Sequence, residues 1–118
     1  MDARERIATL ATDTGYPVYD PGVKPGKCVT PYIVVRQMGT YASINTNGLG
    51  YTLVVVICYV PIGQGAPETL KNMTDAVKAV LAQYPRQLRR TGHESPDMIE
   101  AEYTALSRSV EYQVQKRL

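Results

Sequence analysis

The chain contains neither tryptophan nor phenylalanine, and all of its aromatic residues are tyrosines, nine in number. Tyrosine joins an apolar ring to a polar hydroxyl, so it suits half-exposed positions and surfaces that become interfaces. Cysteine and histidine are also scarce, with two and one copies in 118 residues. A closed zinc site needs four such ligands, and an open one needs three protein ligands. Because no two of these residues are close in sequence, we expect no metal ion and no other cofactor.

The two cysteines, Cys28 and Cys58, are predicted to be reduced packing residues rather than a disulfide. The N-terminal stretch M-D-A-R-E-R-I carries acidic residues and lacks the apolar core of a secretory signal, so we expect synthesis in the cytoplasm. A thiol enzyme would need a base beside its nucleophile. His93, the single histidine, lies in a polar stretch, whereas Cys58 lies in a buried-strand pattern. The sequence therefore predicts no catalytic residue and no enzymatic activity.

Acidic residues are absent between Asp20 and Glu68, a span that contains Lys24, Lys27 and Arg36. The net charge of the whole chain is nevertheless only +2. That excess is too small to indicate nucleic-acid binding, which needs a wide basic face. The middle of the chain is thus uncharged or cationic.

Long hydrophobic runs are absent except for residues 51–61, Y-T-L-V-V-V-I-C-Y-V-P. This run is too short for a membrane helix, and we expect no membrane contact. In an extended chain two sets of side chains face opposite ways: Leu53, Val55, Ile57 and Tyr59 on one side, and Val54, Val56, Cys58 and Val60 on the other. Two apolar, β-branched faces predict a central strand, with a buried helix as the alternative. An antiparallel strand usually leaves one face wet, so the second face needs cover from this chain or from another.

Two helices are predicted. Apolar residues recur at helical spacing from Leu70 to Tyr84 and indicate an amphipathic helix over about residues 67–84, which Pro85 ends. A shorter helix is predicted over residues 1–14, because Ala3, Ile7 and Leu10 share a stripe and Gly15 stands where a C-terminal cap belongs.

Further strands are predicted at residues 32–38, 86–91 and 109–115. Between residues 32–38 and the central strand lies an uncharged segment, residues 39–50, with the turn signal Asn47-Gly48. It predicts a long β-hairpin that projects as a neutral ribbon, with a floppy loop as the alternative. The chain is therefore expected to be a single α+β domain over residues 1–118. Its mainly antiparallel sheet of about four strands would carry both helices on one face.

Once both helices cover one side of this sheet, no apolar segment remains to cover the other side. We therefore predict a contact surface made of the neutral ribbon and an uncovered sheet face. The candidate residues for contacts with other subunits or with a partner are Tyr41, Ile44, Asn47, Leu49, Val54, Val56 and Cys58.

A second candidate contact is electrostatic. Arg86, Arg89 and Arg90 form a basic cluster, and Glu100 and Glu102 belong to the acidic stretch that follows it. The functional interpretation is a contact of these arginines with a phosphate or with an acidic patch on a partner, for which this acidic stretch of a neighbouring copy would serve. The alternative is a solvated edge strand that its arginines protect from aggregation. The acidic stretch lacks the ordered ligand spacing of a calcium loop.

Taken in order, the predicted elements resemble those of the tail terminator (tail completion) proteins of long-tailed bacteriophages. The resemblance covers essentially the whole chain, and its best-matching pieces are P-Y-I-V-V-R at residues 31–36, L-V-V-V-I-C-Y-V-P at residues 53–61 and S-R-S-V-E-Y-Q-V-Q-K-R-L at residues 107–118. These are patterns rather than signature motifs. No catalytic residue is carried over, because the family has none.

The resemblance implies a small α+β protein of the virion that forms a closed ring, commonly of six subunits, at the head-proximal end of the tail. Such a ring docks on the last ring of the major tail tube protein, stops polymerisation and offers a surface to the neck proteins. DNA would pass through it without sequence-specific binding. The nearest alternative is another neck protein, such as a head-tail connector or head-completion protein. An alternative from another class is a small module that binds single-stranded nucleic acid through its tyrosines and arginines.

Overall fold

The computed structural model describes residues 3–22, 26–42, 48–84 and 88–117. These residues form an α+β fold with two α-helices and a six-stranded, mostly antiparallel open sheet. The elements in chain order are α1 (Ala3–Ala11), η1 (Thr12–Thr14), β1 (Val18–Tyr19), β2 (Tyr32–Ala42), β3 (Leu49–Pro61), α2 (Ala66–Leu81), β4 (Leu88–Glu94), β5 (Met98–Glu100), η2 (Ala101–Tyr103) and β6 (Ala105–Arg117).

The strands lie in the order β1-β2-β3-β6-β4, and β5 pairs with the same edge of β6 as β4 does. Only the β1–β2 pair among them is parallel. The sequence predicted about four strands, and this number was too small. The two additional strands, β1 and β5, have two and three residues, which is too short for a period-two pattern to be recognised. Their pairing comes from the neighbouring long strands rather than from their own sequence.

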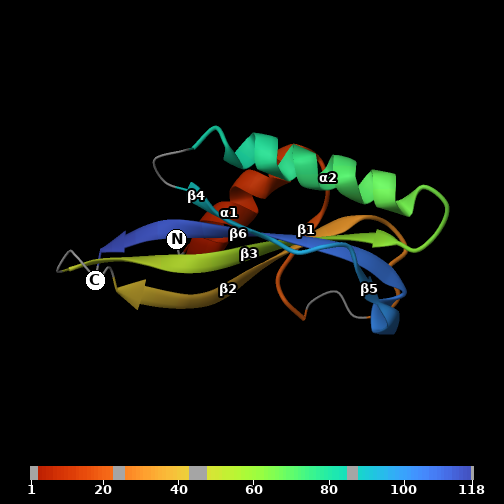
Figure 1. Ribbon diagram of the computed structural model, residues 1–118, viewed down its shortest axis with the longest axis horizontal. Coiled ribbons are helices and arrows are strands. Elements are labelled where there is room, and N and C mark those ends of the chain that lie inside the picture. Colours follow the sequence, from red (N-terminus) through yellow and green to blue (C-terminus); the bar gives the residue numbers. More distant parts are fainter. Residues whose placement is uncertain (1–2, 23–25, 43–47, 85–87, 118) are drawn as a thin grey trace.

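Both helices pack on the same face of the sheet, as predicted (Figure 1). The N-terminus of α2 follows Gly65, whose φ of 78° is accessible to glycine, and Pro67 stands in the first turn. On its outer side Lys71 pairs with Asp75 at 2.9 Å, one helical turn away. The helix ends at Leu81, three residues before the predicted end, and the Ala82 N–H still donates to the Lys78 carbonyl at 2.9 Å.

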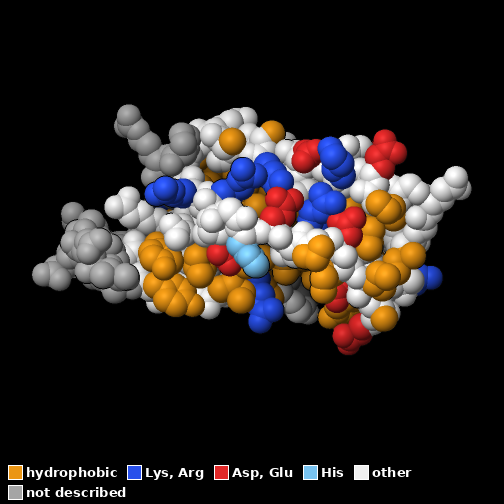
Figure 2. Space-filling view, in the orientation of Figure 1, with side chains coloured by type: hydrophobic (Ala, Val, Ile, Leu, Met, Phe, Trp, Pro, Cys, Tyr) orange, Lys and Arg blue, Asp and Glu red, His pale blue; other side chains and the backbone are white. Residues whose placement is uncertain are grey.

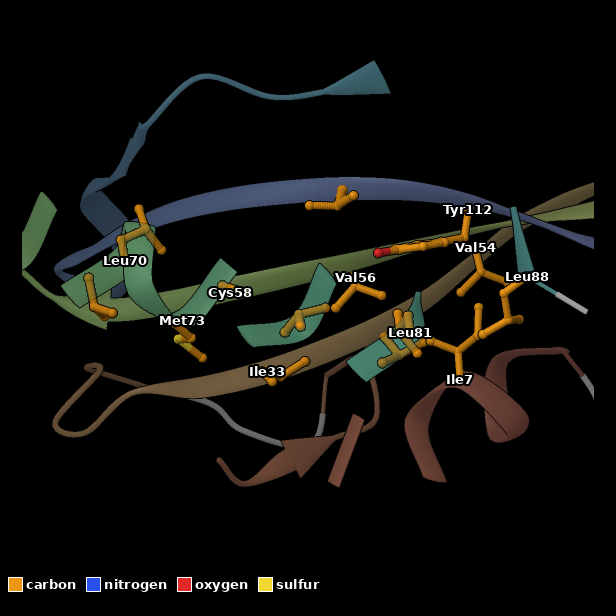
Figure 3. Close-up of a cluster of buried hydrophobic side chains, with 14 of the residues drawn as sticks. Ile7, Ile33, Val54, Val56, Cys58, Leu70, Met73, Leu81, Leu88 and Tyr112 are labelled. Carbon is orange, nitrogen blue, oxygen red and sulfur yellow. The ribbon is translucent and has the colours of Figure 1, made fainter. Parts of the chain in front are cut away.

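The main core lies between α1, α2 and the sheet (Figure 3). Leu70, Met73 and Val77 of α2 are fully buried there, as is Ile7 of α1. The buried side chains below them come from four strands, namely Ile33 and Val35 of β2, Val54, Val56, Cys58 and Val60 of β3, Leu88 of β4, and Val110, Tyr112 and Val114 of β6. Burial of each large aliphatic side chain contributes roughly 1.5–3 kcal/mol, so this layer holds α2 against the sheet.

A β-bulge changes the direction of the side chains in the second half of β2. Arg36 lies opposite Val55, but Gly39 lies opposite Leu53, so β2 has one residue more than β3 between these two pairs. As a result Tyr41 lies opposite Tyr51, and Thr40 lies opposite the buried Thr52 with their hydroxyl oxygens 3.1 Å apart. A regular period-two strand through Met38 would have placed Tyr41 on the helix side.

The molecule measures 50 × 25 × 24 Å along its principal axes. At one end the paired strands β2, β3 and β6 extend beyond α2 (Figure 1). We call this part of the sheet, residues 39–42, 49–53 and 113–117, the projecting end. The pairing of β2 with β3 continues there as far as Ala42 opposite Gly50. The predicted ribbon also included residues 43–47, which lie outside the described residues.

Candidate assembly interface

Three of the predicted contact residues belong to the core. Val54, Val56 and Cys58 have no solvent-accessible surface, because α2 covers the side of β3 that carries them (Figure 3). The prediction that these residues contact a partner was therefore wrong, because within one copy they already pack in the core under α2. Since both faces of β3 are apolar, either face could have received the amphipathic helix. The structure puts the helices on the Val54 side.

The opposite face of the sheet carries apolar side chains that no helix covers within the described ranges. Val34 lies opposite Ile57, and Leu53 and Val55 follow along β3 on the same side. All four are half-buried rather than buried, unlike their neighbours on the helix side. We call this surface the helix-free face. Its apolar row is a partly exposed hydrophobic surface on an otherwise well-packed domain.

Polar side chains border this apolar row on β2 and β6. Arg36 and Glu111 both lie opposite Val55, one on each neighbouring strand, and Gln113 lies opposite Leu53. Arg36 is exposed, whereas Glu111 and Gln113 are half-buried. A hydrophobic centre with a polar, charged rim is the usual composition of a protein–protein interface.

One end of the helix-free face is closed by the segments that precede β2 and β6. Cys28, Tyr32 and Ala105 form a second small core there, and the Cys28 N–H donates to the Tyr103 carbonyl at 2.7 Å. Tyr32 stacks on Tyr59 with ring centroids 5.0 Å apart. Burial, followed by the charge of Glu100, raises the pKa of Tyr59 to about 12. These rings pack on one another, which stabilises the face instead of offering free ring surfaces.

Beside this small core lies a hollow of about 570 Å³, bordered by Val34, Arg36, Ile57 and Tyr59 on the sheet and by Asp20 and Glu102 at its rim. Its aromatic and apolar lining with a rim of mixed charge has the composition of a protein–protein contact.

The other end of the helix-free face is the projecting end. Tyr41 and Tyr51 stack there with ring centroids 5.6 Å apart, and Tyr41 is 47% exposed. Leu49 lies in β3 opposite Arg117, at the tip of the described part of this sheet. The structure thus places the predicted contact residues Tyr41 and Leu49 at this end. Ile44 and Asn47, which were predicted with them, lie outside the described residues.

The predicted charged contacts lie at opposite ends of β6. Arg89 and Arg90 lie opposite Gln113 and Tyr112, whereas Glu100 lies opposite Ala105, and Glu102 follows in η2. Eight residues of β6 separate the two groups, which corresponds to about 27 Å at 3.4 Å per residue. They do not meet within one copy. Arg86, the third arginine of the predicted cluster, lies outside the described residues.

The structure keeps the thiols apart from His93. His93 is exposed on β4, while Cys28 and Cys58 are buried. Burial raises the pKa of the Cys58 thiol to about 11, so it is protonated near neutral pH and is a poor nucleophile. The Cys28 thiol donates to the Thr30 carbonyl at 3.4 Å. No arrangement of nucleophile and base is formed by these three residues.

Two negative findings apply to the described part of the chain. No group of three or more His, Cys, Asp or Glu side chains there is placed to bind a metal ion. None of the helices that the structure describes is long and apolar enough to cross a membrane.

Sequence reasoning missed two surface features. The first is the row of Val34, Leu53, Val55 and Ile57 as the accessible side of the sheet. The polar residues Ser109, Glu111 and Gln113 of β6 could have indicated that side, but only once the register between β3 and β6 was known. The second is the pair Met98 and Ile99, which are 47% and 73% exposed on β5. Two adjacent apolar residues within an acidic stretch were the signal.

Comparison with known proteins adds no assignment: no protein-family model matches this chain, and no curated protein matches it either.

Proposed function

We propose that this protein is a structural assembly protein that forms a closed ring and ends the growth of a phage tail tube at its head-proximal end. The resemblance to tail terminator proteins motivates the particular place in the virion. The single observation that most supports an assembly role is the one-sided cover of the sheet: both helices lie on one face and the apolar row lies on the other.

The helix-free face supports a protein partner because of its composition. Val34, Leu53, Val55 and Ile57 form a continuous apolar strip, and water contact with such a strip is unfavourable. Docking against another chain removes that contact without any change in the fold. The projecting end adds Tyr41, whose exposed ring can cover a large area at little entropic cost.

In this proposal identical copies close a ring through heterologous contacts, and the ring docks on the major tail tube protein. Six subunits is the number that the resemblance implies. The surface turned away from the tube would receive the neck or head-tail connector proteins. DNA would pass through the central opening, and the protein would bind no specific sequence.

The direct test is a tube-growth assay. Tubes are polymerised from the major tail protein with increasing amounts of this protein, and their lengths are measured by electron microscopy. We expect shorter tubes with one ring-shaped cap at an end. Sedimentation velocity and native mass spectrometry of the free and capped forms would give the number of subunits.

A matched pair of variants connects the assay to the helix-free face. Val55→Glu places a charge in the apolar row, where its long side chain can still reach water, and is expected to abolish capping. Val29→Glu makes a similar change at a valine that is 73% exposed in the loop before β2, and is expected to cap normally. Circular dichroism and thermal unfolding would check that both variants fold. Normal capping by Val55→Glu would remove the helix-free face from the proposal.

The same assay separates the proposal from a neck protein. A protein that leaves tube growth unchanged but completes DNA-filled heads for joining would be a head-completion or connector protein. The stack of Tyr32 on Tyr59 argues against single-stranded nucleic-acid binding, because Tyr32 is 4% exposed and offers no ring face to a base. A salt-sensitive shift of a labelled oligonucleotide at low salt would support nucleic-acid binding instead.

A further inference from the structure

A hollow of about 480 Å³ lies between the C-terminal end of α2 and β4. Its floor is apolar and includes Leu81, Leu88 and the ring of Tyr112, while Ala82 and Arg90 border it. A volume of this size is in the range that encloses a small ligand or several side chains. We call this hollow the socket.

The charge around the socket is positive. Arg89, Arg90 and Lys78 line it, and Lys78 is neutralised by Glu94 at 2.7 Å. Within the described residues neither arginine forms an ion pair with another part of the same copy. In Figure 2 the Lys and Arg side chains gather over β4 and the neighbouring end of α2. The socket therefore favours an apolar group that is accompanied by negative charge.

Such a group lies at the far end of the same molecule. Ile99 on β5 is 73% exposed and Met98 beside it is 47% exposed. Glu100 follows directly, and Glu102 is exposed one turn further on. Asp97 already pairs with Arg108 at 2.6 Å, and the half-buried Glu100 accepts a hydrogen bond from the Ser107 hydroxyl at 3.1 Å. The exposed Glu102 therefore supplies the negative charge for a partner. We call residues 98–102 the knob.

One copy cannot place its own knob in its own socket. Leu88 lies opposite Val114 of β6, and Ile99 lies opposite Leu106 of the same strand. The two features are thus about 27 Å apart along one rigid strand. They are different surfaces on opposite ends of one sheet edge, and a contact between them links copies head to tail. Such a heterologous contact closes into a ring when the rotation per copy allows it.

We propose that the knob of one copy, with Ile99 at its centre, docks in the socket of the next copy, where Arg89 and Arg90 face Glu102. This inference rests on the proposed ring, and it names the surfaces by which neighbouring copies meet. Ile99 fills the apolar floor, and the charged pairs fix the orientation and exclude a head-to-head contact.

A cysteine pair tests the contact directly. In the variant Ile99→Cys/Ala82→Cys, mild oxidation should join copies into a ladder of covalent oligomers, in the free protein or on capped tail tubes. The natural thiols of Cys28 and Cys58 do not interfere, because they are 2% and 0% exposed. The matched control is Val29→Cys/Ala82→Cys, since Val29 is as exposed as Ile99. No ladder in either setting, or an equal ladder from the control, would overturn the contact.

Charge exchange tests its direction. Arg89→Glu/Arg90→Glu alone, and Glu102→Lys alone, should each weaken self-association by roughly tenfold or more, because like charges then meet in every contact. A 1:1 mixture of the two variants should associate again in alternating order, with oligomers larger than dimers by sedimentation. A mixture that stays monomeric, or that stops at dimers, would overturn the head-to-tail contact. Retention of association by either variant alone would do the same.

The variant Ile99→Asp separates this inference from the proposed function. If it caps tail tubes as well as the unchanged protein does, the knob contact is wrong and the ring function stands. If cysteine cross-links form as expected but the unchanged protein leaves tube growth unaffected, the contact is correct and the tail function is wrong. Binding of a small anionic amphiphile such as decanoate in the socket, with association unchanged by Ile99→Asp, would assign the socket to a ligand and overturn the inference.

Discussion

Tyr41 stacks on Tyr51 across β2 and β3, with the two ring planes 26° from parallel. The bulge between Gln37 and Gly39 creates this contact, because the extra residue turns Tyr41 to the helix-free face. The Tyr41 ring also lies over Gly39, whose missing Cβ would stand 3.4–3.6 Å from three of its atoms. An aromatic ring over a strand glycine supplies the packing that the glycine lacks and fixes the register of the strand pair.

We therefore expect Tyr41→Ala to lower the free energy of unfolding by about 1 kcal/mol, the usual contribution of an aromatic cross-strand pair. Tyr41→Phe keeps the ring and should leave stability unchanged. Urea unfolding of the three proteins, followed by circular dichroism, measures the difference. An equal loss in both variants would assign the effect to the hydroxyl and not to the stack.

Val55 and Val56 give a second matched pair, because they are neighbours in β3 on opposite faces of the sheet. Val56 is fully buried between Val35 and Val110, whereas Val55 is half-buried between Arg36 and Glu111. Val56→Ala removes two buried methyl groups and leaves a cavity under α2, so we expect a loss of about 2 kcal/mol. Val55→Ala should cost less than about 1 kcal/mol in the single copy but weaken capping of tail tubes. Chemical denaturation and the tube-growth assay measure the two effects, and equal losses of stability would contradict the assignment of the faces.

The class of the fold was predictable because it depends on local patterns. The spacing of Leu70, Met73 and Val77 is enough to indicate a helix with one apolar side, and the α+β class with two helices is confirmed. The face that α2 would cover was not predictable. Both sides of β3 are apolar, so the choice depends on β6, where Val110 and Tyr112 must share the core with Val56. That pairing is non-local and leaves no mark in the sequence of β3.

The candidate site was predictable in part for the same reason. Tyr41, Arg89 and Glu102 are surface residues in the structure, as the polar or neutral character of their segments indicated. Val54, Val56 and Cys58 were assigned to the surface because one layer of helices leaves one apolar face open. The structure does have one layer of helices and one open face. The alternation of side chains along β3, however, does not say which of its two similar faces remains open. The bulge in β2 and the short strand β5 also depend on pairing partners and not on their own residues.

The buried hydroxyl of Tyr112 is expected to lower the stability of the fold. Its hydroxyl is buried and has no hydrogen-bond partner among the described residues, and burial raises its pKa to about 12. A buried polar group without a partner lowers stability by about 1–3 kcal/mol. Tyr112→Phe removes the hydroxyl and keeps the ring, so we expect the free energy of unfolding to rise by about 1 kcal/mol. Thermal unfolding measures this change, with Tyr112→Leu as the control for loss of the ring. A lower melting temperature for Tyr112→Phe would show that the hydroxyl is satisfied in solution.

The buried ionisable groups predict how stability depends on pH. Burial raises the pKa of the Cys58 thiol from 9.0 to about 11 and that of the Tyr112 hydroxyl from 10.0 to about 12. Between these values the unfolded chain has lost protons that the folded chain still holds, so a rise in pH favours unfolding. Stability should be complete below about pH 9 and should fall steadily between about pH 9 and 12, by at most about 1.4 kcal/mol per pH unit for Cys58.

Denaturant titrations at a series of pH values from neutral to alkaline measure this dependence. Cys58→Ala should flatten the lower part of the decline, where only the thiol titrates in the unfolded chain. Tyr112→Phe should make the upper part less steep but not flat, because the pKa of Tyr59 is also raised to about 12. The thiol should also remain unreactive toward a maleimide at pH 8 until the protein unfolds, because it is both protonated and inaccessible under α2. Rapid labelling of Cys58 in the folded protein, or a stability that does not change up to pH 11, would mean that α2 opens from the sheet far more readily than its packing indicates.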